Sequence, residues 1–113
     1  MQVISALAIT VITVEEQLSG WYTALRRARR RDELALAYQS LASSIPFLAQ
    51  WMILPFPTVA IARYDQLLRQ RLNVRRSDLR IAAIVLEHGG TLVTRNTRDF
   101  SRVPGLPLED WSI

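Results

Sequence analysis

Three carboxylates in this sequence stand where a fold with strands and helices can bring them together, at Glu16, Asp78 and Asp99. Each follows a predicted strand or lies near the start of a predicted helix. Because the carboxyl ends of parallel strands meet at one edge of a sheet, the three side chains are expected to converge there. Carboxylate oxygens of this kind can hold Mg²⁺, or alternatively Mn²⁺, and such an ion can activate water against a phosphodiester.

Each of these carboxylates also has a purely structural interpretation. Glu16 stands three residues after Thr13, which is the spacing of a capping box. Asp78 can complement the dipole of the helix that it opens. Asp99 stands three residues after Asn96, another candidate cap. Periodicity alone does not separate these interpretations from the metal site.

The segments around these residues alternate between predicted strands and predicted helices. Apolar, β-branched runs predict buried strands, and apolar residues at helical spacing predict helices. The predicted strands cover residues 7–12, 53–56, 91–94 and 106–111, and the predicted helices cover residues 13–28, 32–52, 58–72 and 77–88. Residues 95–100 are predicted to be a polar connection. This alternation favours an α/β domain with a parallel sheet.

Capping residues and a proline refine the bounds of these helices. The expected caps are Thr13, Thr58 and Ser77 before helices and Gly89 after the last helix. Pro46 is expected to kink or divide the second helix. In the third helix, Val59, Ala62 and Leu67 are expected to face the core.

Length and composition limit the class of protein. The 113 residues suit a single domain, residues 1–113, and half of them are apolar. The absence of cysteine excludes disulfides, thiolate zinc sites and cysteine nucleophiles. The apolar run near the start has no basic segment before it, and Thr and Glu interrupt it before it could span a bilayer. A cytoplasmic protein without a membrane contact is therefore expected.

Charge leaves a nucleic-acid substrate open. The net charge is +4, and all 14 basic residues are Arg. Guanidinium groups suit bidentate contact with phosphate, so such a surface is compatible with RNA. The run Arg26–Arg31 is interpreted as a solvated helix end, with RNA contact as the alternative. The single histidine, His88, is interpreted as a contact at a helix end rather than a general base.

One apolar segment has two interpretations. Residues 45–56, "IPFLAQWMILPF", are expected to lie in the core, with a partner-binding surface as the alternative. Trp21, Trp51 and Trp111 are expected in the core or at an interface rather than as platforms for base stacking.

Taken in order, the motifs resemble the PIN-domain family, and within it the VapC-type toxin ribonucleases of toxin–antitoxin pairs. The resemblance rests on "TVEEQLSGW" (13–21), on the central "PF…A…YDQLL" segment, and on "SDLRIAAIVLEHGGTLVTRNTRDFSRVPGLPLEDW" (77–111). It implies a PIN-like three-layer fold, in which helices flank a parallel sheet. It also implies a metal-dependent endoribonuclease, and it covers most of the chain from residue 9 onward.

The resemblance assigns roles residue by residue. Glu16, Asp78 and Asp99 match the acids that bind Mg²⁺ or Mn²⁺, and Asn96 matches a polar residue that assists the site. Thr94 matches a hydroxyl beside it. Arg95 and Arg98 are expected to contact the phosphates of an RNA substrate. A cognate antitoxin protein and a second copy of the chain, in a homodimer, are the partners that the resemblance implies.

The N-terminal part departs from the family pattern. Family members normally begin with a central strand that carries an Asp, whereas this sequence has no acidic residue before Glu15. The expectation is a domain truncated at its N-terminus, in which strands 7–12 and 91–94 are left with unpaired edges. In-frame DNA upstream of Met1 is expected to encode roughly 30 to 45 residues, the size of one strand–helix unit. Without that segment, the alternative function is a catalytically inactive module that binds an antitoxin or another partner.

Overall fold

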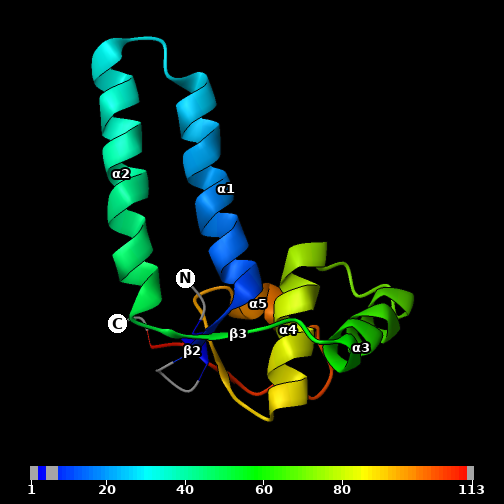
Figure 1. The fold of residues 1–113 in the computed structure, drawn as a ribbon. Helices are drawn as coiled ribbons and strands as arrows, with labels where there is room; N and C mark the ends of the chain where they lie inside the picture. Colours follow the sequence, from blue (N-terminus) through cyan, green and yellow to red (C-terminus); the bar gives the residue numbers. More distant parts are fainter. Residues whose placement is uncertain (1–2, 5–7, 112–113) are drawn as a thin grey trace.

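The computed structural model describes residues 3–4 and 8–111. Its strands are β1 (Val3–Ile4), β2 (Ala8–Thr10), β3 (Met52–Leu54), β4 (Leu92–Val93) and β5 (Leu108–Glu109). Its helices are α1 (Val11–Arg27), α2 (Arg31–Ala49), α3 (Thr58–Arg69), α4 (Arg76–His88) and α5 (Thr97–Phe100). Helices α1 and α2 form a long hairpin that extends away from the sheet, and α3 and α4 pack against each other beside it (Figure 1).

The five strands form one mixed sheet in the order β3-β2-β1-β4-β5. β2 is parallel to β3 and β4 is parallel to β5, whereas β1 is antiparallel to both β2 and β4. Strands β2, β3, β4 and β5 therefore all run in one direction, and their carboxyl ends lie at the same edge. The predicted α/β fold with helices flanking parallel strands is confirmed.

The centre of the sheet differs from the expectation. The segments predicted at 7–12 and 91–94 were expected to face each other with unpaired edges. Instead, Ile4 pairs with Ala8 of β2, and Val3 and Ile4 pair with Val93 and Leu92 of β4. The chain thus fills the central position with a short antiparallel strand, because backbone groups inside a sheet require partners.

Helix α4 forms the middle of the hydrophobic core. Its sequence supplies a run of buried small and branched residues, and helix α3 packs against it along most of its length. The buried residues of α4 are Leu79, Ile81, Ala82, Ala83, Ile84 and Val85. Phe100 of α5 and Leu92 of β4 complete this core from the C-terminal part of the chain. Burial of these side chains fixes α4, and with it any functional residue at its start.

The start of α1 lies one turn earlier than predicted. Val11 and Ile12, expected in a strand, are already helical, and the N-cap is Thr10 rather than Thr13. The Thr10 side chain accepts a hydrogen bond from the backbone N–H of Thr13 at 3.2 Å. Both threonines have capping chemistry at the same spacing, and the strand pairing of Thr10 with Leu54 decides which one caps the helix.

The predicted caps of the next two helices are also wrong. Helix α3 begins at Thr58 with Pro57 as its N-cap, and α4 begins at Arg76 with Arg75 as its N-cap; neither cap residue makes a side-chain capping bond. Ser77 therefore lies inside α4. The C-terminal prediction is confirmed, because Gly89 caps α4 with φ of 75°, a left-handed conformation that glycine adopts without strain.

The buried face of α3 is shifted from the predicted one. Val59 and Ala62 are exposed, whereas Ala60, Tyr64 and Leu67 are buried. Only Leu67 was assigned correctly, because apolar residues occur on two faces of this helix and the sequence does not show which one meets α4.

The second arm of the hairpin contradicts two expectations. Pro46 neither kinks nor divides it, since α2 continues from Arg31 to Ala49. The segment 45–56 is not mainly core: Ile45, Phe47, Met52 and Ile53 are exposed, and Leu48 and Leu54 are buried. The hairpin extends beyond the sheet, so much of α2 has no core to pack against (Figure 1).

Residues 95–100 are not only a polar connection, since Thr97–Phe100 form the short helix α5. No helix in the described part of the chain is long and apolar enough to cross a membrane.

Candidate functional site

The first candidate residue, Glu16, lies in the second turn of α1. Helix α1 starts directly at the carboxyl end of β2, because Thr10 both ends the strand and caps the helix. Since the helix begins at Val11, Glu16 does not complete a capping box with Thr13. Its side chain keeps 35% of its exposure. The structural interpretation of Glu16 as a cap is therefore wrong.

The second candidate residue, Asp78, lies in the first turn of α4 and is almost completely buried. Its side chain is only 1% exposed. Both carboxylate oxygens are close to one guanidinium: Arg75 Nη2 lies 3.3 Å from Asp78 Oδ1, and Arg75 Nε lies 3.4 Å from Oδ2. A buried carboxylate requires such a charged partner.

Arg75 connects the first two candidates. Its Nη2 atom also lies 3.6 Å from Glu16 Oε2, so one guanidinium contacts carboxylates from α1 and α4. The hydrogen bond and charge of Asp78 raise the pKa of Arg75, and the charges of Glu16 and Asp99 add to this effect. The structure therefore brings Glu16 and Asp78 to a common cation.

Burial also changes the titration of Glu16. Loss of solvent raises the pKa of its carboxyl group above 4.5, Arg75 partly offsets this by lowering it, and the charges of Asp78 and Glu15 raise it again. A carboxylate with a raised pKa in a shared site is the kind of group that functional sites contain. The same shift is expected for any half-buried acid beside another acid, so it supports the site only together with the geometry.

The third candidate residue, Asp99, is held by a second arginine. Asp99 lies in α5, and Arg102 Nη1 is 3.2 Å from its Oδ1 atom. The same Nη1 donates a hydrogen bond to the carbonyl oxygen of Asn73 at 2.9 Å. Asn73 belongs to the turn that precedes Arg75, so Arg102 joins the segment of Asp99 to the segment that carries the first two candidates.

Asn96 and Thr94 shape the chain between β4 and α5. Thr94 is buried, and its hydroxyl oxygen accepts a hydrogen bond from the backbone N–H of Asn96 at 3.0 Å. Asn96 occupies the N-cap of α5, but its side chain makes no capping bond. Arg95 and Arg98, on either side, are exposed.

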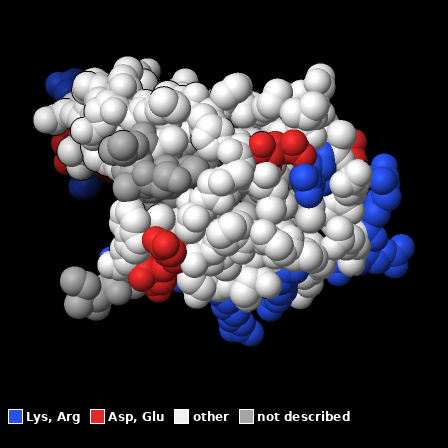
Figure 2. Space-filling view, turned by 90° about the horizontal axis from the view of Figure 1, so that it is seen from below, with Lys and Arg blue, Asp and Glu red and all other residues white. Residues whose placement is uncertain are grey.

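The described residues do not form a site that fits a divalent metal ion as they stand. Carboxylates are the donors that Mg²⁺ and Mn²⁺ prefer. However, no group of three acidic, histidine or cysteine side chains in the described part of the chain lies close enough together to hold a metal. On the face shown in Figure 2, the acidic side chains likewise lie in separate small groups. The predicted acids are thus paired with arginines rather than with one another.

Sequence reasoning missed Arg75 and Arg102. Both stand three residues from an acid, in "RRSD" and "DFSR", and this spacing brings side chains together on a helix. The spacing was therefore visible, but such pairs are common on helix surfaces and usually contribute little.

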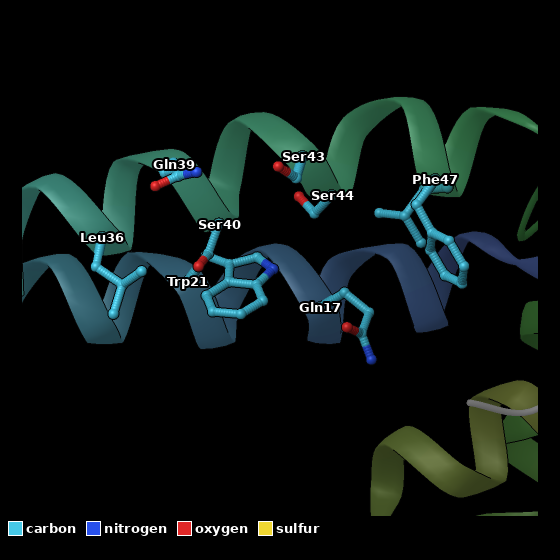
Figure 3. Close-up of a pocket in the computed structure, with 9 residues that line it drawn as sticks. Gln17, Trp21, Leu36, Gln39, Ser40, Ser43, Ser44 and Phe47 are labelled. Atoms are coloured by element: carbon cyan, nitrogen blue, oxygen red, sulfur yellow. The ribbon is translucent and has the colours of Figure 1, made fainter.

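A groove between the two helices of the hairpin is the largest hollow near the site. It has a volume of about 400 Å³. Figure 3 shows Gln17 and Trp21 of α1 facing Ser40, Ser44 and Phe47 of α2 across it. The indole N–H of Trp21 is buried and has no hydrogen-bond partner in the described residues. Such a donor is costly to leave unpaired, and a bound chain could satisfy it.

Comparison with known proteins gives related sequences. No protein-family model matches the chain. Over 60 residues it is 38% identical to Ribonuclease VapC1 of Rickettsia felis, a match that spans 50% of this chain and 45% of that protein. Over 111 residues it is 28% identical to Ribonuclease VapC2 of the same organism, which spans 95% of this chain and 75% of that protein. The better-conserved match thus spans less than half of its relative.

Comparison of folds gives similar solved structures. The chain matches a DNA-bound VapBC structure from Salmonella typhimurium with a TM-score of 0.78 and 28% identity, over 96% of this chain and 77% of that one. A toxin–antitoxin complex from Klebsiella pneumoniae matches with a TM-score of 0.63 and 27% identity, over 88% of this chain and 70% of that one.

These matches identify the class of the protein. The sheet whose carboxyl edge leads into α1 and α5, with acidic residues in both helices, is a PIN-like α/β fold. Within that class, the sequence and structural matches together place the chain in the VapC-type family.

Proposed function

We propose that this chain is a VapC-type endoribonuclease, which hydrolyses RNA phosphodiester bonds at the carboxyl edge of the sheet. The observation that carries the proposal is the convergence of Glu16 and Asp78, from two different helices, on one cationic group. Ribonuclease relatives and VapBC structures support it.

For this chemistry we propose Mg²⁺, with Mn²⁺ as an alternative, as the ion that Glu16, Asp78 and Asp99 bind. Such an ion supplies positive charge to a phosphate and lowers the pKa of a bound water. Arg75 and Arg102 occupy these carboxylates in the structure and must first release them. Asn96 lies on the segment that connects β4 to Asp99, where it can position the substrate. Arg95 and Arg98 are exposed and form no ion pair with the described residues, so both can contact RNA phosphates.

Cleavage of RNA by the purified chain tests the proposal. With Mg²⁺ or Mn²⁺, we expect cleavage that a chelator stops. Asp78→Asn is expected to reduce the rate at least about 100-fold, which is typical when one essential charged group of an active site is lost. Asp65→Asn, at an exposed position of α3, is the matched control and should cleave at the wild-type rate. Equal rates in the two variants would contradict the assignment of Asp78.

We further propose that an antitoxin protein binds the groove between α1 and α2. The support is the exposed apolar surface of the hairpin, the unpaired indole of Trp21, and the similarity to a toxin–antitoxin complex. A helix that lays its apolar side chains into such a groove would bury both features.

The pairing of both acids with arginines favours a second candidate function. If Asp78 and Asp99 remain paired with Arg75 and Arg102, the chain is an inactive module that only binds its antitoxin. Binding of the antitoxin without any RNA cleavage, with or without Mn²⁺, would select this function over the first.

A further inference from the structure

The contacts of Arg75 have an unusual asymmetry between the cation and its anions. The Asp78 side chain is 1% exposed, whereas the Arg75 side chain is 68% exposed. Asp78 is fixed in the first turn of the buried helix α4, and Arg75 precedes that helix. The carboxylate therefore cannot move towards solvent, but the guanidinium can leave it by a rotation of an exposed side chain.

Departure of Arg75 would leave a negative charge that needs a replacement. The Asp78 carboxylate has no other hydrogen-bond or ion-pair partner among the described residues. Glu16, half-buried at 3.6 Å from the same guanidinium, adds a second negative charge at this position. A buried charge without a partner is strongly unfavourable, so another cation is required when Arg75 swings out.

We propose that the Arg75 guanidinium holds the place of a divalent cation between Glu16 and Asp78, and that Mg²⁺ or Mn²⁺ binds there only after Arg75 swings into solvent. The two cations compete, because both need the same oxygens of Asp78. The identity of the ion rests on the proposed function, whereas the competition itself rests on the contacts of Arg75.

The same arrangement occurs at the third acid, which supports competition over coincidence. Asp99 is paired with Arg102, also three residues away, and Arg102 is anchored to the carbonyl oxygen of Asn73. Arg102 is half-buried and has this second partner, whereas no partner other than Glu16 and Asp78 is seen for the Arg75 side chain among the described residues. Arg75 is therefore the arginine that can be displaced more easily.

Binding of Mn²⁺ to the full chain tests this competition without any RNA. We expect Arg75→Gln to bind Mn²⁺ about tenfold more tightly than the wild type, since removal of a unit charge beside the site changes affinity by this order. Arg76→Gln, the matched control, removes the same charge one residue away and should stay within about a factor of two of the wild type. Electron paramagnetic resonance of free Mn²⁺ measures both affinities.

Thermal unfolding gives a second readout. Without metal, Arg75→Gln is expected to melt at a lower temperature than Arg76→Gln, and saturating Mn²⁺ should restore more of the lost stability in Arg75→Gln. Equal Mn²⁺ affinity in the two variants, or no binding to either at millimolar Mn²⁺, would overturn the proposal. If Arg75→Gln does not fold, the wild type still provides a test, because Mg²⁺ should then shift the NMR signal of the Arg75 Nε–H, and an unchanged signal at saturating Mg²⁺ would overturn it.

These outcomes are separate from those of the ribonuclease test. A chain that binds Mn²⁺ more tightly after Arg75→Gln but never cleaves RNA would retain the competition and lose the proposed function. A chain that cleaves RNA but has the same Mn²⁺ affinity with and without Arg75 would do the reverse.

Discussion

At the scale of single residues, the site is a set of opposite charges with unequal access to water. Asp78 is buried, Glu16 is half-buried, and Arg75 reaches solvent while contacting both. The exposed Arg30–Glu33 pair in the hairpin has similar distances but no buried member, so it contributes little to stability. Burial of one partner distinguishes Arg75–Asp78 from an ordinary surface ion pair.

Glu16 gives a pH dependence with a definite sign. Its pKa is raised in the folded protein, mainly by burial, so the folded chain binds a proton on Glu16 more readily than the unfolded chain does. The free energy of unfolding should therefore fall as pH rises from about 4.5 through the folded pKa. Glu16→Gln should lose this decrease, so its stability relative to the wild type should rise over the same pH interval. Urea unfolding at several pH values measures the difference.

Glu15→Gln provides the comparison for this prediction. It removes a carboxylate from the same turn of α1 at an exposed position, so it reports the effect of charge alone. If the two variants show the same pH profile relative to the wild type, burial of Glu16 is not the cause.

The residues show what the sequence could reveal about the site. Glu16, Asp78 and Asp99 were visible as acids that follow strands or lie near helix starts, and the structure brings the first two of them to one cation. Their arginine partners were not predicted, because whether an i,i+3 pair is buried depends on the packing of distant segments. The role of Asn96 and the binding of Mg²⁺ stay predictions.

At the scale of elements, local signals gave the kinds of helix and strand more reliably than their bounds. Gly89 ends α4 as predicted, since a left-handed residue is required there and glycine provides it. The start of α1 was missed because Thr10 and Thr13 have the same capping chemistry, and only the pairing with β3 distinguishes them. The exposed face of α2 could not be predicted, because apolar residues at helical spacing normally indicate a core.

The hairpin leads to a prediction about partner binding. Phe47 lines the groove between α1 and α2, whereas Tyr38 is equally exposed on α2 but does not line it. Phe47→Glu should weaken binding of the antitoxin encoded by the neighbouring gene at least about 30-fold, the effect expected at the centre of an interface. Tyr38→Glu should change it little. Isothermal titration calorimetry measures both affinities, and equal losses would argue against the groove as the binding site.

At the scale of the whole molecule, the chain is more extended than its length requires. Its radius of gyration is 15.7 Å, and its principal extents are 48 × 31 × 27 Å. A compact chain of this length is expected to have a radius of gyration of about 13 Å. The hairpin accounts for the long dimension (Figure 1). An isolated chain of this shape leaves apolar surface in water, which favours assembly with partners.

The edge of the sheet leads to a prediction about assembly. β3 is the outermost strand on its side, and its Met52 side chain is 65% exposed next to the exposed Ile53. We expect two copies of the chain to associate through this edge, as a homodimer. Met52→Glu should weaken association at least about tenfold, because it places a charge in an apolar contact. Trp111→Gln, an exposed aromatic residue beyond β5 at the opposite edge, is the control.

Sedimentation equilibrium of the free chain measures this association. A monomeric wild type at all concentrations would contradict the homodimer, and an equal effect of the two substitutions would place the contact elsewhere.

Helix α1 carries Glu16 towards one neighbour and Gln17 towards another. Glu16 contacts Arg75, while Gln17 and Trp21 line the hairpin groove, and a smaller hollow bordered by Glu16, Gln17, Gly20 and Trp21 joins the two regions on the same helix. A protein segment seated in the groove would therefore press on the same turn of helix that positions Glu16. Occupation of the groove and occupation of the cation site are thus mechanically linked, so a partner bound along the hairpin can alter the affinity for the ion without touching it.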